Sequence, residues 1–191
     1  MKIPVIVKRE FLGDKNCDYH ALMVVSCFGK NNLKKRSVSI DSKYIASIKE
    51  DIEETSNKSW ITTYKSLVKM SNTYKELIKV RKVKTNNVYT ISYSNKNNKG
   101  YMLVDDNIIK TLLKSKDSST IKTYLLLKTM CDKESKVVSR KYICKHIGLS
   151  PKSTTNLDKV SRITDFLQEN NLIKKEYTHA EGNSSIKYSI I

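Results

Sequence analysis

The sequence predicts an α+β protein that is mainly α-helical and in which one pattern of helices and strands occurs twice. In the second half, a Gly148-Leu149-Ser150-Pro151 turn separates two amphipathic segments, and a β-hairpin pattern closes the chain. The first half has a similar order of helix, strand, helix, helix and hairpin. This order is that of a winged helix-turn-helix, so the sequence predicts two such domains in tandem.

The C-terminal part shows the pattern most clearly. Ser139 can cap a short helix, which ends at Gly148 because glycine tolerates the left-handed backbone of a helix C-terminus. Ser150 or Thr155 can cap the helix that follows, and a β-hairpin is predicted over 172–190. The second helix is predicted to bury the apolar residues at helical spacing, which are Leu157, Val160, Ile163 or Thr164, and Leu167.

The other face of this second helix carries hydrogen-bond donors in one stripe without an acidic residue, although Asp158 and Asp165 lie nearby. Such a face can combine phosphate neutralisation with hydrogen bonds to base edges in the DNA major groove. The alternative is a solvated helix face in a lysine-rich protein. The predicted DNA-binding residues of this stripe are Lys152, Ser153, Thr154, Thr155, Asn156, Lys159 and Arg162.

The charge of the chain also indicates a polyanionic partner. The 191 residues carry 36 Lys and Arg against 19 Asp and Glu, which gives a formal net charge of +17. Both halves are basic, because residues 1–100 hold 20 Lys and Arg and 9 Asp and Glu, and residues 101–191 hold 16 and 10. Lysine outnumbers arginine 31 to 5, so part of the excess can instead reflect the codon usage of an AT-rich genome.

The four cysteines do not predict a metal site. They lie far apart without a C-x-x-C pair, and three scattered histidines are the only nitrogen ligands, so free and mostly buried thiols in a reducing compartment are expected. No apolar run approaches membrane-spanning length, and the N-terminus lacks the hydrophobic centre of a signal peptide. We therefore expect a soluble, cytoplasmic protein without a metal, a cofactor or a membrane contact.

The first half repeats the pattern with less clear boundaries. Its predicted elements, in order, are a strand or extended arm over 1–11, a helix over 14–28, a strand over 37–40, a helix that Asp41 or Ser42 caps, a helix over 59–71 and a hairpin over 77–93 that turns at Asn86-Asn87.

Short residue matches between the halves support an internal repeat. They occur in the same order and at nearly constant offset, which indicates two related domains, although common residues in similar elements can also coincide. The matches are Lys43-Tyr44-Ile45 with Lys141-Tyr142-Ile143, Leu77-Ile78-Lys79 with Leu172-Ile173-Lys174, and Tyr89-Thr90-Ile91 with Tyr188-Ser189-Ile190.

A polar break over 95–100 separates the halves. We therefore predict an N-terminal domain over 1–97 and a C-terminal domain over 98–191, with a connecting helix near 105–114. The helix over 118–130 has apolar residues on more than one face and should be central to the second core.

An acidic cluster, Glu50-Asp51-Ile52-Glu53-Glu54, distinguishes the first domain from the second. Acidic side chains repel DNA phosphates, so three arrangements are open. The cluster points away from DNA, or this domain contacts DNA mainly through Lys58, Lys65, Lys69 and its hairpin, or the domain binds a protein partner.

The combined pattern resembles the tandem winged-helix proteins of low-GC Gram-positive plasmids, phages and related mobile elements, which include replication initiators. The first half resembles them less closely, because it has the acidic cluster and lacks a Gly-Leu-Ser turn. Between Leu149 and Leu172 this chain is longer than the turn and recognition helix of a compact regulator. We therefore expect the recognition helix to start late, near Thr155, and to leave 151–154 as a loop over the DNA backbone. The residues that carry the resemblance are Tyr142-Ile143 through Gly148-Leu149-Ser150-Pro151-Lys152-Ser153 and Phe166-Leu167 through Leu172-Ile173-Lys174, within 118–191.

This resemblance implies a sequence-specific, double-stranded DNA-binding protein that initiates replication at repeated origin sequences or regulates transcription. A homodimer and replication proteins are further candidate partners. A different class, the winged-helix interaction modules of chromosome or replisome complexes, is usually acidic, which disfavours it here. We expect no enzyme and no catalytic residue, because the chain lacks the His-x-His pair of nicking enzymes, a clustered Arg and His set and a glycine-rich nucleotide loop.

Overall fold

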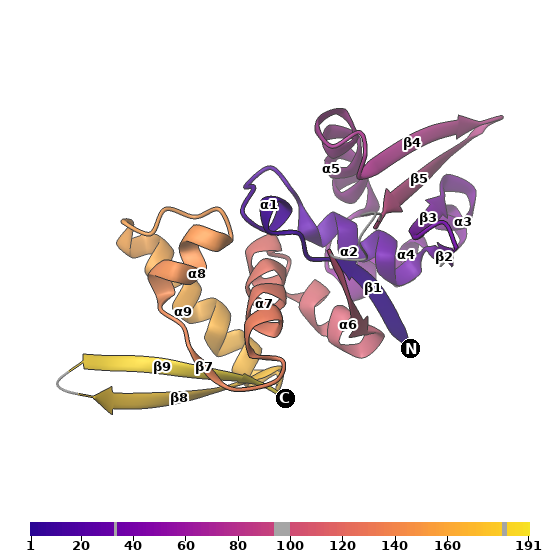
Figure 1. Cartoon of the computed structure of the whole chain (residues 1–191). Helices are drawn as coiled ribbons and strands as arrows, with labels where there is room; N and C mark the ends of the chain where they lie inside the picture. The colour runs from indigo at the N-terminus through magenta and orange to yellow at the C-terminus, as the bar shows by residue number, and fades with distance from the viewer. Residues whose placement is uncertain (33, 94–99, 181–182) are drawn as a thin grey trace. The chain divides into compact units, whose positions relative to one another are not determined.

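The computed structural model describes residues 1–32, 34–93, 100–180 and 183–191 (Figure 1). It combines α-helices with small antiparallel sheets, in agreement with an α+β protein. The chain forms two compact units, the first from residues 1–8 and 16–118 and the second from residues 9–15 and 119–191. No helix in the described part of the chain is long and apolar enough to cross a membrane.

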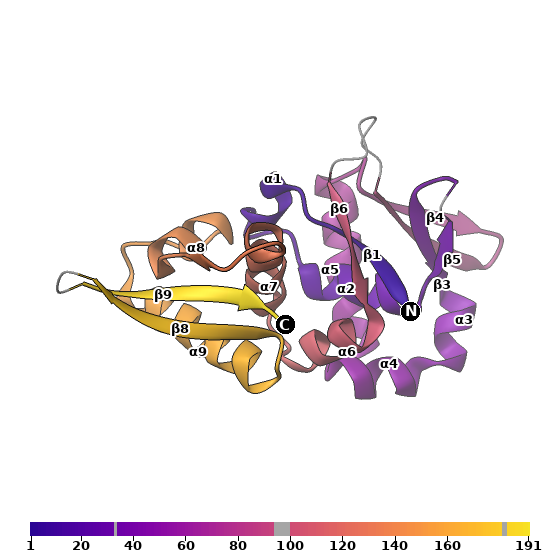
Figure 2. The same ribbon diagram turned by 60° about the horizontal axis from the view of Figure 1, so that its bottom comes forward.

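The first unit contains two antiparallel sheets and a group of helices around α2. Its elements are β1 (Lys2–Ile6), α2 (Tyr19–Phe28), β2 (Lys30–Asn32), β3 (Ser37–Asp41), α3 (Ser42–Ser47), α4 (Lys49–Ser56), α5 (Trp60–Thr73), β4 (Ile78–Val83), β5 (Asn86–Ser92), β6 (Tyr101–Asp105) and α6 (Asp106–Lys114). One sheet has the strand order β2-β3-β5-β4, and the other pairs β1 with β6 (Figure 2). Helix α2 contacts α5, α6 and both sheets, so it lies at the centre of this unit.

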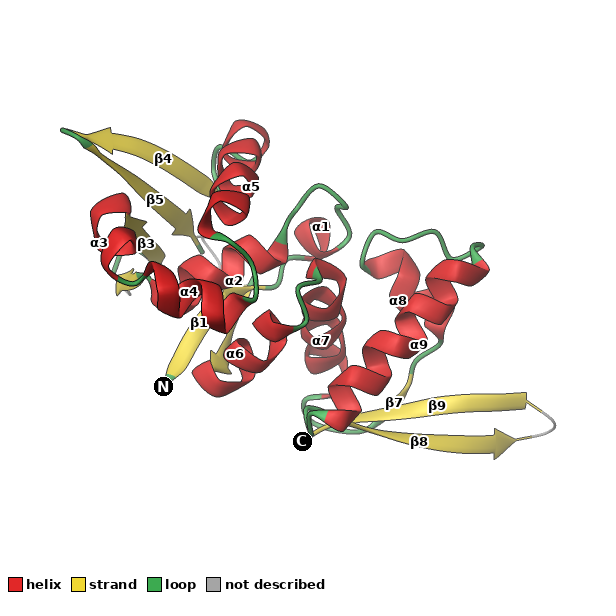
Figure 3. Ribbon diagram, turned by 180° about the vertical axis from the view of Figure 1, so that it is seen from behind, coloured by secondary structure: helices red, strands yellow, loops and turns green. Residues whose placement is uncertain are grey.

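The second unit contains a bundle of helices and one sheet. Its elements are α1 (Arg9–Leu12), α7 (Ser118–Cys131), β7 (Lys136–Val137), α8 (Arg140–His146), α9 (Thr154–Glu169), β8 (Ile173–Ala180) and β9 (Asn183–Ile190). The sheet has the order β7-β9-β8, and α9 packs against α8 and β8 (Figure 3). Ile121, Tyr124, Leu125 and Leu127 of α7 are completely buried, as the apolar residues on several faces of this helix predict.

Part of the two units follows the same order of elements, α2-β3-α3-α5-β4-β5 in the first and α7-β7-α8-α9-β8-β9 in the second. The first unit has β1, β2, α4, β6 and α6 in addition, and the second has α1. In each unit, the strand before the short helix α3 or α8 pairs with the last strand of the hairpin, as β3 does with β5 and β7 with β9. The matched residues of the internal repeat also occupy equivalent register positions, since Ile78 lies opposite Ile91 and Ile173 lies opposite Ile190. Tyr89 and its counterpart in the second unit are buried. The buried repeat residues are Ile45, Ile143, Leu77, Leu172, Ile78, Ile173, Tyr89, Tyr188 and Ile91.

The division into units differs from the predicted boundary between residues 97 and 98. Strand β6 pairs with β1, and α6 packs against α2 and α4, so the predicted connecting helix belongs to the first unit. The chain therefore passes between the units after residues 8, 15 and 118. The predicted polar break lies, except for Gly100, outside the described residues.

Several predicted helix and turn boundaries are also wrong. Helix α2 starts only at Tyr19, because the Asp18 side chain accepts hydrogen bonds from the backbone N–H groups of the first turn. The hairpin of the first unit turns at Lys84, which adopts a left-handed φ of 56°, and not at Asn86-Asn87. Ser153 caps α9 in place of Ser150 or Thr155, and it accepts a hydrogen bond from the Asn156 backbone at 3.4 Å.

The segment 9–15 is a structural part of the second unit. Leu12 is buried, and the Lys122 ammonium group, itself only 3% exposed, donates a hydrogen bond to the Asp14 carbonyl at 2.6 Å. The segment also contacts the turn before α9 so closely that a Cβ atom on Gly148 would lie 2.5 Å from the Gly13 carbonyl oxygen. Gly148 has φ +81°, a conformation that strains other residues.

We predict that Gly148→Ala destabilises the protein by about 1–3 kcal/mol or more, because it adds the positive-φ strain to a steric clash with Gly13. Urea unfolding followed by circular dichroism measures the change. Ser150→Ala is the matched control, since Ser150 is exposed in the same turn and does not have a positive φ. Equal unfolding midpoints for the two variants would show that the segment 9–15 does not restrict this turn.

His20 forms a buried link in the first unit. Its Nε2 atom lies 3.0 Å from the Ser56 carbonyl oxygen and 3.1 Å from that of Leu113, and the residue is 1% exposed. Two nearby carbonyl acceptors require a hydrogen on Nε2, so this nitrogen is the donor. Burial lowers the pKa of the His20 imidazole below its usual value, and the positive charge of Lys58 lowers it further, although Asp18 and the two carbonyl groups partly oppose the shift.

We predict that the protein loses stability as the pH falls below about 6.5, the pKa of an unfolded histidine. Because the folded-state pKa of His20 is lower, the unfolded chain binds the proton first, with a slope of at most about 1.4 kcal/mol per pH unit. Urea unfolding between pH 7.5 and 5.5 measures this slope. His20→Gln keeps a donor for a carbonyl group without titrating, so it should flatten the pH dependence; an unchanged slope would assign the effect to other groups.

Candidate nucleic-acid interface

Helix α9 has a clearly divided surface. Val160, Ile163, Thr164 and Leu167 are buried against the rest of the second unit, as the apolar spacing predicts. On the opposite side, Thr154, Asp158 and Arg162 follow one another at intervals of four residues and are all exposed. Helix α9 therefore presents a solvent-facing side of mixed charge.

The predicted donor stripe is only partly exposed. Lys152, Thr154, Thr155 and Arg162 are exposed, whereas Ser153, Asn156 and Lys159 are half-buried. The expectation that no acidic residue shares this surface is wrong, because Asp158 lies between Thr154 and Arg162. Asp165 is exposed as well, but it forms an ion pair with Lys175 of β8. Packing determines which face of α9 is buried. With this face buried, the Asp158 side chain lies on the exposed side of the helix.

Asn156 has a contact that the sequence did not predict. Its side-chain Nδ2 donates a hydrogen bond to the Ser150 carbonyl oxygen at 3.1 Å, and its backbone N–H donates to the Ser153 cap. This geometry closes the turn between α8 and α9. The amide Nδ2 is therefore engaged within the protein, whereas the sequence predicted that Asn156 donates hydrogen bonds to DNA.

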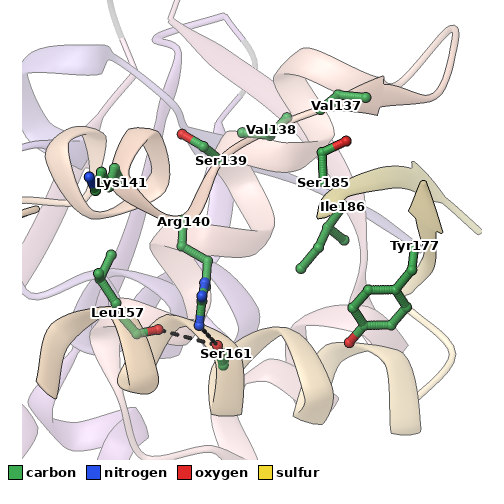
Figure 4. A pocket seen from close by; sticks show the side chains of 10 residues that line it. All are labelled: Val137, Val138, Ser139, Arg140, Lys141, Leu157, Ser161, Tyr177, Ser185 and Ile186. Atoms are coloured by element: carbon green, nitrogen blue, oxygen red, sulfur yellow. Dashed lines mark hydrogen bonds between the residues drawn. The ribbon is translucent and has the colours of Figure 1, made fainter. Parts of the chain in front are cut away.

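A cavity of about 410 Å³ lies between the start of α8, helix α9 and the β8–β9 hairpin. Figure 4 shows Arg140 extending from α8 toward Ser161 on α9, and its Nη1 donates a hydrogen bond to the Ser161 Oγ at 3.0 Å. Tyr177, which is 64% exposed, stands on the hairpin side. Among the residues that the structure describes, the lining has two cationic residues and no acidic residue. These lining residues are Val137, Val138, Ser139, Arg140, Lys141, Leu157, Ser161, Tyr177, Ser185 and Ile186. We call it the α8–α9 cavity.

The first unit has a more strongly basic surface. Lys65 and Lys69 lie one turn apart on the exposed side of α5, and Lys79 and Arg81 are exposed on β4. An open hollow of about 430 Å³ lies between these elements, lined by Ser71, Asn72, Lys75, Ile78, Lys79, Val80 and Arg81. Neither α5 nor β4 contains an acidic residue. We call the set formed by Lys65, Lys69, Lys75, Lys79 and Arg81 the α5–β4 surface.

Lys58 is not part of this surface. It is half-buried in the connection between α4 and α5, where its backbone N–H and carbonyl groups interact with the Ser56 hydroxyl group. The acidic cluster forms α4, which packs against α6 and α2, and its Glu53 accepts a hydrogen bond from the Trp60 backbone at 2.9 Å. The acidic residues thus occupy a separate helix that anchors the start of α5.

Metal and thiol chemistry have little support. Among the described residues, no group of three or more His, Cys, Asp and Glu side chains is placed to hold a metal ion. The cysteines are free thiols, of which Cys17, Cys131 and Cys144 are buried. Burial raises the pKa of the half-buried Cys27 thiol to about 11, which keeps it protonated at neutral pH.

Comparison with known proteins finds no protein-family model, no curated protein and no solved structure that matches this chain.

Sequence reasoning did not identify Arg140 or Ser161 as parts of the site. Their contact spans 21 residues, and neither residue belongs to a recognisable motif. Ser139, by contrast, was predicted as the cap of α8, and it does accept a hydrogen bond from the Tyr142 backbone at 3.1 Å. Ser139 is thus a residue of this site that the local sequence did indicate, in its role as a helix cap.

We predict that Asn156→Ala lowers the free energy of unfolding by about 0.5–1.5 kcal/mol, because it removes the hydrogen bond to the Ser150 carbonyl. Thr155→Ala, at the exposed neighbouring position, should change it much less. Chemical denaturation of both variants gives the comparison. If Asn156→Ala leaves stability unchanged but alters base preference in DNA binding, the amide contacts DNA as the sequence alone predicts.

Proposed function

We propose that this chain is a sequence-specific double-stranded DNA-binding protein built from two winged helix-turn-helix units. In each unit the helix before the hairpin, α5 or α9, would be the recognition helix and the hairpin the wing. The shared strand pairing, of β3 with β5 and of β7 with β9, supports this assignment. The equivalent positions of the repeat residues support it too.

The observation that carries the proposal is the α5–β4 surface. Two of its five cations lie on α5, two lie on β4 and Lys75 lies in the connection between them. None of the five has an ion pair with an acidic residue within the described part of the chain. Unneutralised Lys and Arg side chains along a helix and a hairpin are suited to release counterions from a DNA backbone. This agrees with the arrangement in which the first domain contacts DNA mainly through its lysines and its hairpin, except that Lys58 does not belong to the α5–β4 surface.

The α8–α9 cavity supplies a second place for a phosphate group. Arg140 and Lys141 provide charge, and the Ser139 hydroxyl group can donate a hydrogen bond. The Ser161 hydroxyl group already donates to the Leu157 carbonyl, and that of Ser185 pairs with Thr178. Tyr177 is exposed beside the cavity and can contact a sugar or phosphate. A DNA backbone placed here would run between α9 and the hairpin, which leaves the exposed side of α9 for the bases.

We favour an initiator-like protein of a plasmid, phage or mobile element over a transcriptional regulator. Two unequal units in one chain match a directly repeated, asymmetric DNA site, whereas a palindromic operator mirrors the symmetry of a dimer. Regulation of transcription, as a homodimer, is the alternative. A genome-wide footprint separates them: repeats near the gene of the protein favour initiation, and a palindrome over a promoter favours regulation.

We predict that binding to double-stranded DNA depends steeply on salt. With about four or more phosphates contacted, a plot of log affinity against log salt should have a slope of about −4 or steeper between about 50 and 200 mM. Lys65→Ala with Lys69→Ala should make the slope less steep by about 2, because two phosphate contacts are lost. Fluorescence anisotropy with a labelled duplex measures both values.

The matched control is Lys110→Ala with Lys114→Ala, which removes the same charge from α6. Both lysines are exposed, and Figures 1 and 3 show α6 and α5 on opposite sides of α2. The control should keep nearly the whole slope. Equal losses in the two double variants would indicate an effect of net charge alone, and a flat salt response of the unmodified protein would refute DNA binding.

A further inference from the structure

The exposed side of α9 carries an acidic residue where a DNA-binding helix faces phosphates. Asp158 lies between Thr154 and Arg162 in a row of exposed residues, four positions from each. In the first unit, by contrast, the corresponding helix α5 has no acidic residue. A role for Asp158 in the fold is the first explanation to consider.

The contacts of Asp158 do not provide such a role. No ion pair joins it to any described residue, although Arg162 stands at the favourable spacing of four. Asp158 is the fifth residue of α9, beyond the first turn in which the helix dipole stabilises an anion. The two other acidic residues on this side differ, because Asp165 pairs with Lys175 and Glu169 is the last residue of the helix.

An anion on a DNA-facing helix weakens binding to every sequence, because the phosphates repel it equally everywhere. Only a base that donates a hydrogen bond can offset this loss. In the major groove, cytosine presents its N4 amino group as a donor, and Asp and Glu are the side chains that accept from it. At DNA sites without such a base the repulsion is not offset, so it disfavours binding to those sites.

We propose that Asp158 is a specificity-determining residue that accepts a hydrogen bond from the N4 amino group of a cytosine in the major groove. Arg162, one turn further along α9, donates to the O6 and N7 atoms of a guanine. One helical turn advances about 5.4 Å, so the two bases lie about one or two steps apart. This inference rests on the proposed function, because it requires α9 to enter the groove.

The test compares Asp158→Ala and Asp158→Asn with the unmodified protein, all as full-length chains. A duplex selected by the unmodified protein from a random pool serves as the preferred site, and a scrambled duplex serves as the reference. Each Asp158 variant should bind the scrambled duplex more tightly, and the ratio of the two affinities should fall by about 5- to 100-fold. Replacing the contacted cytosine by thymine should weaken the unmodified protein but not Asp158→Ala.

Glu169→Ala is the matched control, because it removes the same charge from the same exposed side at the far end of α9. It should strengthen binding to both duplexes alike and keep their ratio. If the Asp158 variants behave like this control, Asp158 is an ordinary surface anion and the proposal is wrong. If the Asp158 variants lose discrimination at a position that holds adenine in the preferred site, the pairing of Asp158 with a cytosine is wrong. If the unmodified protein binds no duplex, the proposed function itself fails, an outcome distinct from both.

Discussion

The pairing of a short strand with the last strand of a hairpin determines the form of both units. An isolated two-stranded hairpin is marginally stable in water, and a third strand together with a helix gives it a buried face. In the second unit this third strand is only Lys136 and Val137, which lie opposite Tyr188 and Lys187. Tyr188 is completely buried there, and burial raises the pKa of its phenol to about 12, so it remains neutral. The hairpin is thereby held beside the helix that precedes it.

This arrangement has different electrostatic consequences in the two units. In the first, α5 and β4 both carry exposed cations and no acidic residue, although exposed Glu76 lies in the connection between them. In the second, α9 alternates between Arg162 and acidic side chains, and the cations of α8 lie in a cavity beside it. Phosphate contacts give affinity and base contacts give specificity. The proposed function therefore divides these roles, with affinity concentrated in the first unit and discrimination in the second.

The internal repeat was accessible from sequence because several of its matched apolar residues are buried in both units. Ile45 and Ile143 face inward from equivalent helices, and an apolar residue at such a position is required wherever the pattern recurs. The donor stripe of α9 was less predictable. Which residues of the stripe are exposed depends on the side of α9 that packs inward. A rotation of the helix by one residue position decides whether Asp158 lies inside or outside the stripe.

By itself, the sequence determined the main helices and the two hairpins, the Asp41 and Ser139 caps and the excess of positive charge, since these depend on residues close together in the chain. Only the tertiary structure placed the segment 9–15 against Gly148 and Arg140 against Ser161. It also placed the Asn156 side chain in a hydrogen bond with the turn before α9, and it placed α6 in the first unit. The physical reason is that such contacts arise from packing between distant segments, which hydrophobic periodicity within one segment does not encode.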